Sequence, residues 1–163
     1  MQVREMTATD WPSVARIYRE GIDTGVATFE LATPVYEDWD RGHLPFCRLL
    51  VTENNHILGW AALSAVSGRC VYGGVAEVSI YVGADARGRG VGKKLMEVLI
   101  PASEAVGIWT LQSGIFPQNL VSIQLHKSCG FRYIGKRERI AKRNGLWYDN
   151  LLFERRSTVV GTD

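Results

Sequence analysis

The sequence predicts a single α+β domain built on one mixed, mostly antiparallel sheet of about six to seven strands, flanked by three to four helices. Apolar residues alternate with period two in some segments and recur at helical spacing in others, and the two kinds of segment interleave along the 163 residues. No linker, repeat or low-complexity tract divides the chain. We therefore expect one domain over residues 1–156 and a flexible C-terminal tail over residues 157–163.

The expected elements follow from periodicity and from residues that start or stop them. Asp10 followed by Pro12 predicts the start of the first helix, and the pair Asn54-Asn55 predicts a hairpin turn because asparagine tolerates positive φ. Residues 21–34 lack periodicity and predict a loop. Strands are expected over 3–6, 48–53, 57–64, 75–82, 109–116, 133–141 and 147–154, and helices from Trp11, over 35–42, from Val91 and over 119–128.

Residues 75–82 carry the clearest strand pattern and lead into the clearest helix. One face of the strand is apolar, and the opposite face carries Glu77, Ser79 and Tyr81. The following helix repeats apolar residues at helical spacing but contains Pro101, which we expect to kink or shorten it because proline lacks an N–H donor.

The composition excludes several classes of protein. Apolar residues make up 46% of the chain and charged residues 22%, which is typical of a globular domain. The net charge of +2 is too small to indicate a nucleic-acid surface, and no apolar stretch reaches the roughly 18–20 residues that span a bilayer. The N-terminus lacks the apolar core of a secretory signal, so we expect a cytoplasmic protein with no nucleic-acid or membrane partner.

The three cysteines are scattered and form no Cys-x-x-Cys pair. Cys47, Cys70 and Cys129 are best explained as reduced thiols, and no flanking motif supports a catalytic cysteine. We expect no metal site.

A basic, glycine-rich loop joins the strand over 75–82 to the helix that follows it. The N-terminus of a helix presents unpaired N–H groups and a partial positive charge, both of which favour a phosphate. Glycines allow the backbone to approach such a ligand, and Arg87, Arg89, Lys93 and Lys94 add positive charge. The segment therefore predicts a site for a ligand that contains a diphosphate.

Two well-known diphosphate motifs do not fit this loop. A P-loop requires a glycine five residues before Gly92 and a hydroxyl residue at position 94, where this chain has Arg87 and Lys94. A dinucleotide fingerprint that begins at Gly88 and Gly90 requires glycine or alanine at position 93, where this chain has Lys93.

The pattern Arg-x-x-Gly-x-Gly, formed by Arg87, Gly90 and Gly92, resembles the acetyl-CoA pyrophosphate loop of the GCN5-related N-acetyltransferase (GNAT) family. The stretch from Asn119 to Phe131, with Ser122, His126 and Gly130 inside it, resembles the family's helix along the pantetheine arm. The two motifs occur in the family's order, and the resemblance covers nearly the whole chain. It implies the GNAT fold with splayed fourth and fifth strands, acetyl-CoA as co-substrate and an amine acceptor.

Three further segments are similar to the phosphinothricin and methionine-sulfoximine acetyltransferase branch of that family. They are 76–82 with Glu77, the run 27–30, and 147–149. The loop over 67–73 departs from the branch because it is compact. The resemblance implies a small, amino-acid-like acceptor, and it implies a homodimer.

The resemblance assigns roles to named residues. Glu77 is expected to be the general base, His126 or solvent to return a proton to the leaving thiolate, and Arg69 to hold an anionic group of the acceptor. The expected cofactor-binding residues are Ile80, Val82, Arg87, Gly88, Arg89, Gly90, Val91, Gly92, Lys93, Asn119 and Ser122. The expected substrate residues are Phe29, Glu30, Arg69, Tyr72, Trp147 and Tyr148.

Plainer interpretations stand beside these roles. Glu77 is also compatible with the solvent-facing side of a strand, His126 with a core histidine, and Asn119 with a helix cap alone. A non-catalytic acyl-CoA-binding domain is an alternative for the whole chain. So is an acetyltransferase for a polyamine, an aminoglycoside or a protein N-terminus, although no run of acidic residues predicts a groove for a polycation.

Overall fold

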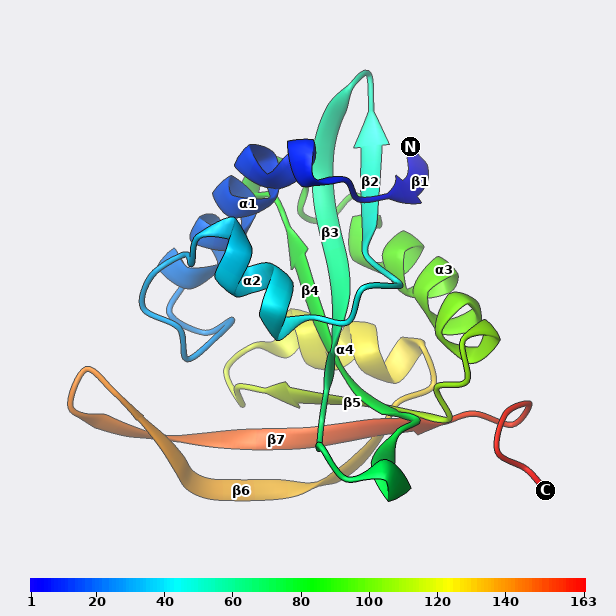
Figure 1. The fold of residues 1–163 in the computed structure, drawn as a ribbon. Helices are drawn as coiled ribbons and strands as arrows, with labels where there is room; N and C mark the ends of the chain where they lie inside the picture. Colours follow the sequence, from blue (N-terminus) through cyan, green and yellow to red (C-terminus); the bar gives the residue numbers. More distant parts are fainter.

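The computed structural model describes residues 1–163 and contains one seven-stranded mixed sheet in the order β1-β2-β3-β4-β5-β7-β6 (Figure 1). The strands are β1 (Gln2–Glu5), β2 (Leu49–Glu53), β3 (His56–Ala65), β4 (Val75–Val82), β5 (Thr110–Ile115), β6 (Arg132–Arg143) and β7 (Leu146–Arg156). The α-helices are α1 (Trp11–Asp23), α2 (Tyr36–Gly42), α3 (Val91–Ala105) and α4 (Leu120–Ser128). The predicted fold class is confirmed.

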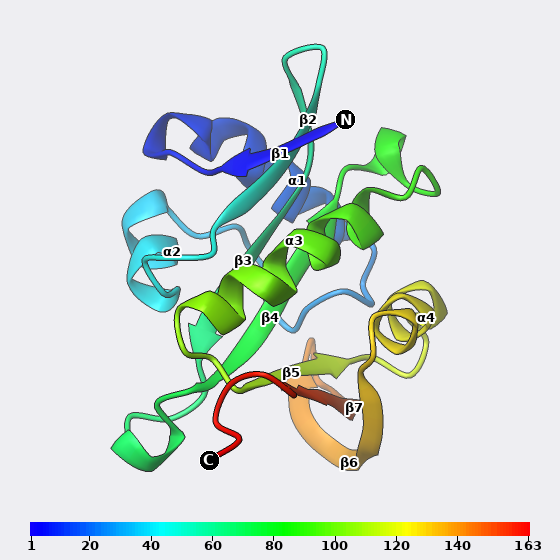
Figure 2. The same cartoon turned by 90° about the vertical axis from the view of Figure 1, so that its right-hand side faces the viewer.

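Helices cover both faces of the sheet, so the domain has three layers (Figures 1 and 2). Helices α1 and α2 pack on one face around Trp39 and Trp60, which are almost completely buried. On the opposite face α3 packs its apolar side, including Leu95 and Leu99, against β2, β3 and β4, and α4 lies beside it. These two cores on either side of one sheet hold β4 rigidly in the middle of the molecule.

Strands β4 and β5 form the one parallel pair of the sheet, and they separate halfway along β4. Their pairing runs from Val75 with Thr110 to Glu77 with Gln112 and ends there. Beyond Glu77, β4 keeps β3 on one edge but has no strand on the other, while β5 continues beside β7. The predicted splay is therefore present, and it leaves the edge of residues 78–82 that faces away from β3 without a strand partner.

Local turn chemistry agrees with the sequence, but one of the two expected effects of Pro101, a shortened helix, is not found. Asn54 and Asn55 both have positive φ, 50° and 63°, as the hairpin turn requires. Pro101 does not shorten α3, which continues to Ala105. The proline leaves the carbonyl of Glu97 without its helical donor, and Glu97 lies on the exposed face of the helix.

The β6–β7 hairpin is longer than the sequence predicts and contains a bulge. The pairing shifts between Arg137 and Ala141, and Arg139 has a φ of 45° inside that shift. The side chain of Asp149 accepts a hydrogen bond from the Arg139 backbone N–H at 2.9 Å and so holds the bulge in place. Bulges of this kind redirect the side chains beside them.

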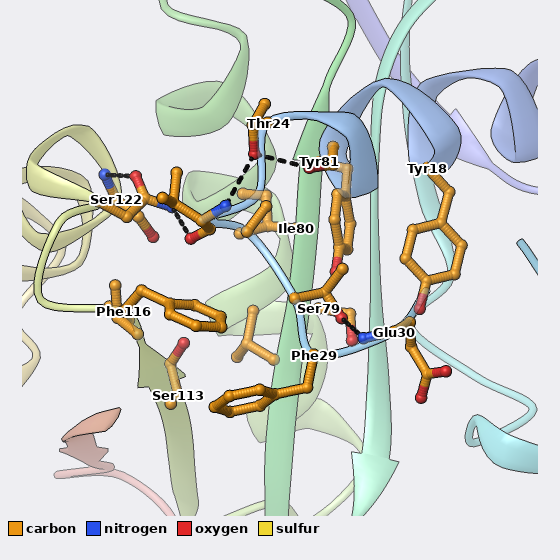
Figure 3. Close-up of a pocket in the computed structure, with 18 of the residues that line it drawn as sticks. Tyr18, Thr24, Phe29, Glu30, Ser79, Ile80, Tyr81, Ser113, Phe116 and Ser122 are labelled. Carbon is orange, nitrogen blue, oxygen red and sulfur yellow. Dashed lines mark hydrogen bonds between the residues drawn. The ribbon is translucent and has the colours of Figure 1, made fainter. Parts of the chain in front are cut away.

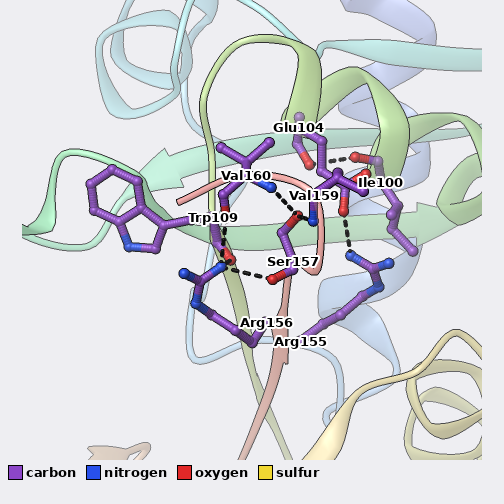
Figure 4. A network of polar contacts seen from close by, with 9 residues as sticks. Ile100, Glu104, Trp109, Arg155, Arg156, Ser157, Val159 and Val160 are labelled. Carbon is purple, nitrogen blue, oxygen red and sulfur yellow. Dashed lines mark hydrogen bonds and ion pairs between the residues drawn. The ribbon is translucent and has the colours of Figure 1, made fainter. Parts of the chain in front are cut away.

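Residues after β7 turn back onto the start of β5 (Figure 4). Ser157 is buried, its N–H donates to the Trp109 carbonyl at 2.8 Å, and its hydroxyl accepts from the N–H groups of Val159 and Val160. The Arg156 guanidinium donates to the carbonyls of Trp109 and Val160. The segment that we expected to be a flexible tail is thus tied to the domain by hydrogen bonds through its first residues.

None of the helices is both long and apolar enough to span a bilayer. All three cysteines are free thiols.

Candidate functional site

A cavity of about 880 Å³ opens where β4 and β5 separate (Figure 3). Its walls come from the unpaired part of β4, the loop between α1 and α2, the end of β5 and the start of α4. The split sheet therefore creates a space that reaches backbone groups normally hidden between two strands.

Glu77 stands at the point of separation. It is half-buried, lines the cavity and faces Gln112, whose Nε2 donates to Glu77 Oε2 at 3.0 Å. The second carboxylate oxygen, Oε1, has no hydrogen-bond partner within the chain. A carboxylate that is fixed by one oxygen and free at the other is suited to accept a proton from a ligand in the cavity.

The loop before α3 offers an uninterrupted row of backbone donors. The first hydrogen bond of the helix runs from Lys94 N to Gly90 O at 3.0 Å, and the N–H groups of residues 87–93 have no partner within the chain. Gly88 and Gly90 have φ values of 75° and 80°, which only glycine adopts without strain. Such a row at a helix N-terminus is an anion site.

The side chains of this loop divide into two groups. Arg87 and Gly88 line the cavity, as expected of a phosphate site. Arg89 instead forms an ion pair with Glu53 of β2, and Lys93 faces Glu97 at 4.0 Å along α3. We expected all these cations to point to one ligand, and this expectation needs correction. Of the cations in the loop, Arg87 is the one that lines the cavity.

Val91 and Gly92 have structural roles that the loop motif does not reveal. Val91 is 1% exposed as a whole residue, and its side chain belongs to the core between α3 and the sheet. A Cβ atom on Gly92 would lie 2.9 Å from Leu125 Cδ2. Gly92 therefore allows α3 and α4 to pack closely, which brings the two predicted motifs together.

Helix α4 begins with a cap that also holds the cavity wall. Asn119 Oδ1 accepts from the Ser122 N–H at 3.1 Å, and Asn119 Nδ2 donates to the Val26 carbonyl at 3.3 Å. Asn119 thus acts as the helix cap and also as the link to the loop between α1 and α2. Both Asn119 and Ser122 line the cavity, as do Ile80 and Val82.

His126 is buried in α4 and also lines the cavity. Its Nδ1 lies 2.7 Å from the Ser122 carbonyl, which can only accept, so Nδ1 carries the proton and Nε2 is the unprotonated nitrogen. Nε2 is buried without a partner in the chain. Burial lowers the pKa of His126, although the contact with the Ser122 carbonyl opposes that shift, so the ring is neutral at pH 7.

Aromatic rings form the floor of the cavity around the loop between α1 and α2. Phe29 lies 4.5 Å from Phe116 between ring centroids, and Tyr148 packs edge-on against both rings (Figure 3 shows the first two). Glu30 lines the cavity near Tyr18. The expected substrate residues Phe29 and Glu30 are therefore at the cavity, and Tyr148 supports Phe29 from behind.

Three expected substrate residues lie away from the cavity. Arg69 and Tyr72 are exposed on a short 3-10 turn and contact each other, with the guanidinium 5.7 Å from the ring centroid. Trp147 is 58% exposed near the tip of the β6–β7 hairpin. Arg69 does not line the cavity of the single chain, because it lies on the compact external turn.

The structure places other residues at the cavity that the sequence did not indicate. Ser79, Tyr18 and Tyr81 line it from β4 and α1, and burial raises the pKa of Tyr81. Arg137 and Asn150 line it from β6 and β7. Alternation marks Ser79 and Tyr81 as sharing the Glu77 face, whereas no local pattern marks the other three.

No group of three or more His, Cys, Asp or Glu side chains is placed to hold a metal ion.

Comparisons with known proteins agree with this geometry. Residues 7–131 match the Acetyltransferase (GNAT) family. A phosphinothricin N-acetyltransferase of Alcaligenes faecalis is 31% identical over 163 residues, covering 94% of this chain and 81% of that protein. An L-methionine sulfoximine/L-methionine sulfone acetyltransferase of Pseudomonas aeruginosa is 27% identical over 154 residues, covering 90% of this chain and 89% of that protein.

A solved structure shares the whole arrangement. The crystal structure of a GNAT superfamily phosphinothricin acetyltransferase from Sinorhizobium meliloti, in complex with AcCoA, superposes with a TM-score of 0.87 at 28% identity. The alignment covers 99% of this chain and 91% of that one. Sequence motifs, split sheet and fold comparison lead to one conclusion: the chain belongs to the acetyltransferase (GNAT) family.

Proposed function

We propose that this chain is an acetyl-CoA-dependent N-acetyltransferase that acetylates the amine of a small, amino-acid-like molecule. One observation carries the proposal: the row of unpaired N–H groups at residues 87–93 adjoins the same cavity in which Glu77 stands where β4 and β5 part. A phosphate-binding end and a basic end in one cavity match a transfer from a long diphosphate-containing donor.

The residues present fit acetyl-CoA at both ends of the donor. The backbone of residues 87–93 and the Arg87 guanidinium supply donors for the two phosphates. The free edge of β4 supplies backbone groups for the pantetheine arm, and the N–H groups of Ile80 and Val82 are our candidates to polarise the thioester carbonyl. Bound acetyl-CoA supplies an activated acyl group.

Glu77 is the proposed general base. An alkylammonium has no lone pair, so the acceptor must lose a proton before its nitrogen forms a bond to the acyl carbon. Glu77 Oε1 is free to accept that proton, directly or through one water, while Gln112 holds Oε2. The C–N bond then forms as the C–S bond breaks. The nitrogen loses its second proton to water as the amide forms, and the sulfur leaves as a thiolate that needs one proton.

His126 is the proposed partner of the leaving sulfur, with solvent as the other source of that proton. Nε2 is the ring nitrogen that is free to exchange a proton, since Nδ1 is engaged with the Ser122 carbonyl. Because the buried ring is neutral, it must take up a proton before it can donate one. His126 therefore differs from a residue that already carries its extra proton when acetyl-CoA binds.

The acceptor class rests on the shape of the cavity and on the relatives. Phe29 and Phe116 form an apolar wall with Tyr148 behind them, and Glu77 and Glu30 supply negative charge that favours an ammonium group. Similar proteins are named for phosphinothricin, methionine sulfoximine and methionine sulfone. These three compounds are therefore the acceptors to test.

We further propose that two copies of the chain associate through the β6–β7 hairpin. Several large apolar side chains are exposed on it, and an exposed apolar patch commonly marks an interface. They are Tyr133, Ile134, Ile140, Leu146 and Trp147. Multi-angle light scattering should give twice the chain mass, and a Trp147→Glu variant should shift it towards the monomer.

The decisive experiment measures thiol release from acetyl-CoA with the three acceptors and identifies the N-acetylated product by mass spectrometry. We expect turnover that depends on both substrates. If the folded protein binds acetyl-CoA but acetylates no member of a broad amine panel, the non-catalytic acyl-CoA-binding alternative replaces the proposal. If it does not bind acetyl-CoA at all, both fail.

A further inference from the structure

Two polar residues of the β6–β7 hairpin, the exposed Arg137 and the buried Asn150, meet at the wall of the cavity. Arg137 and Asn150 are cross-strand partners, and Arg137 Nη2 donates to Asn150 Oδ1 at 2.6 Å. Asn150 is only 5% exposed, and both residues line the cavity. The amide oxygen therefore fixes the guanidinium in one orientation.

The charge of Arg137 has no counterpart in the chain. Arg137 forms no ion pair, although the neighbouring Lys136 lies 3.4 Å from Glu138 and 3.9 Å from Asp149. Its remaining N–H groups make no hydrogen bond, and Asn150 Nδ2 has no acceptor either. A fixed guanidinium beside a free amide N–H₂ is a set of converging donors, which is the chemistry that recognises an oxyanion.

The same face of the sheet carries this pair and Glu77. Gln112, which holds Glu77, and Gly114 are two residues apart on β5 and so share a face, about 7 Å apart along the strand. A Cβ atom on Gly114 would lie 2.8 Å from Asn150 Nδ2 and 3.2 Å from Arg137 Nη2. The missing side chain at position 114 is what leaves room for the pair.

We propose that Arg137 and Asn150 form a subsite that binds the anionic group of the acceptor, so that this cavity selects zwitterionic amino acids over amines without an acid. The proposal rests on the proposed N-acetyltransferase function and refines it. The ammonium of such an acceptor lies towards Glu77 and its oxyanion towards Arg137. The cavity thus offers a negative charge at Glu77 and a positive charge at Arg137, matching the two charges of the molecule.

The test compares acceptors that differ in whether and where they carry negative charge. L-Methionine sulfone has its anion at the α-carboxylate, its α-carboxamide has none, and the α-carboxamide of L-phosphinothricin keeps only the phosphinate. Relative kcat/KM for these three shows which oxyanion uses the subsite. Comparing ratios between protein variants cancels the different basicities of the acceptor amines.

Arg137→Gln and Asn150→Asp are the informative variants. Arg137→Gln removes the charge, and Asn150→Asp places a carboxylate beside Arg137 that pairs with it and repels the acceptor's anion. Both should lower kcat/KM for methionine sulfone by about 10–100-fold, mainly through KM, and leave the uncharged carboxamide and the KM of acetyl-CoA nearly unchanged. Arg139→Gln, on the same strand but outside the cavity, is the matched control.

Each outcome decides the question. The subsite is supported if the parent protein prefers anionic acceptors and Arg137→Gln lowers kcat/KM for these acceptors to the value for the carboxamide. An equal loss with charged and uncharged acceptors, or an unchanged preference in a variant whose circular dichroism and melting temperature are normal, overturns it. If the parent protein itself acetylates no amine, that result counts against the proposed function instead of against the subsite.

Discussion

Gln112 Nε2 lies 3.0 Å from Glu77 Oε2 across the last paired position of β4 and β5. The bond joins the two strands at the place where the sheet opens, so it fixes the position of the carboxylate and marks the inner end of the cavity. Glu77 therefore reaches the cavity with one oxygen held and the other free. The predictions below start from this pair and move outward.

Replacing Glu77 with glutamine should lower kcat by about 10²–10³-fold, because the amide cannot accept the amine proton. The affinity for acetyl-CoA should stay the same, since Gln at position 77 does not alter the phosphate loop. Gln112→Leu should lower kcat only about fivefold, through loss of one orienting hydrogen bond. Steady-state kinetics and calorimetry measure both effects. Glu37→Gln, an exposed change on α2, is the control, and unchanged turnover in Glu77→Gln would remove this residue from the mechanism.

Arg87→Ala should weaken acetyl-CoA binding about 10-fold, because Arg87 is the guanidinium of the loop that lines the cavity. Arg89→Ala should change the dissociation constant about twofold at most, since Arg89 pairs with Glu53. Calorimetric titration at two salt concentrations checks this, and binding by the Arg87 variant should depend less on salt. Arg19→Ala, an exposed change on α1, controls for net charge. Equal affinities for all variants would contradict the placement of the phosphates.

Gly74→Ala should destabilise the fold by about 1–3 kcal/mol through overpacking. A Cβ atom there would lie 2.0 Å from Trp109 Cε3, and the bond from Trp109 N to the Gly74 carbonyl at 2.8 Å holds the two backbones close together. Gly68→Ala is the matched control, because a Cβ at position 68 meets nothing within 4 Å. Urea denaturation gives both free energies of unfolding, and similar values for the two variants would show that the contact is not tight.

Acidification below pH 6.5 should lower stability through two histidines, the half-buried His43 and the buried His126. Burial lowers the pKa of both His43 and His126 from the usual 6.5, so between that value and their folded-state pKa the unfolded chain binds protons that the folded chain does not. The free energy of unfolding therefore falls as pH falls through this window. Carboxyl groups with lowered pKa, such as Asp10 and Glu104, act in a separate, more acidic window.

The slope of stability against pH between 7.5 and 5.5 tests this account. His126→Gln should reduce the slope, whatever its effect on absolute stability, because one proton-linked group is gone. The exposed residue His56 provides the control, since His56→Gln should leave the slope as it is. An unchanged slope in the His126 variant would contradict burial of a neutral ring.

Sequence patterns predicted the parts of the site that depend on short stretches of chain. Alternation along residues 75–82 placed Glu77 opposite the apolar face, and the glycines before α3 indicated the donor row, since both follow from the backbone conformation of neighbouring residues. The bounds of β4 were predicted to the residue. Pro101 misled the prediction of α3 because an exposed helical carbonyl tolerates loss of its partner.

Contacts between distant segments could not be predicted in this way. Arg69 carried the expected charge but lies on a compact external turn, whereas Arg137 reaches the cavity through its cross-strand partner Asn150. The position of Arg137 depends on the β6–β7 register, on the bulge that follows it and on the space above Gly114. None of these leaves a local pattern in the sequence.

The sequence by itself determined the family, the strand that bears the carboxylate and the loop that offers the phosphate donors, because each depends on residues within a few positions of one another. Only the tertiary structure decided which cations face the cavity and which histidine nitrogen is free, because those follow from packing between segments far apart in the chain. Side-chain direction at such contacts is set by the neighbours that surround it, and a linear pattern does not contain them.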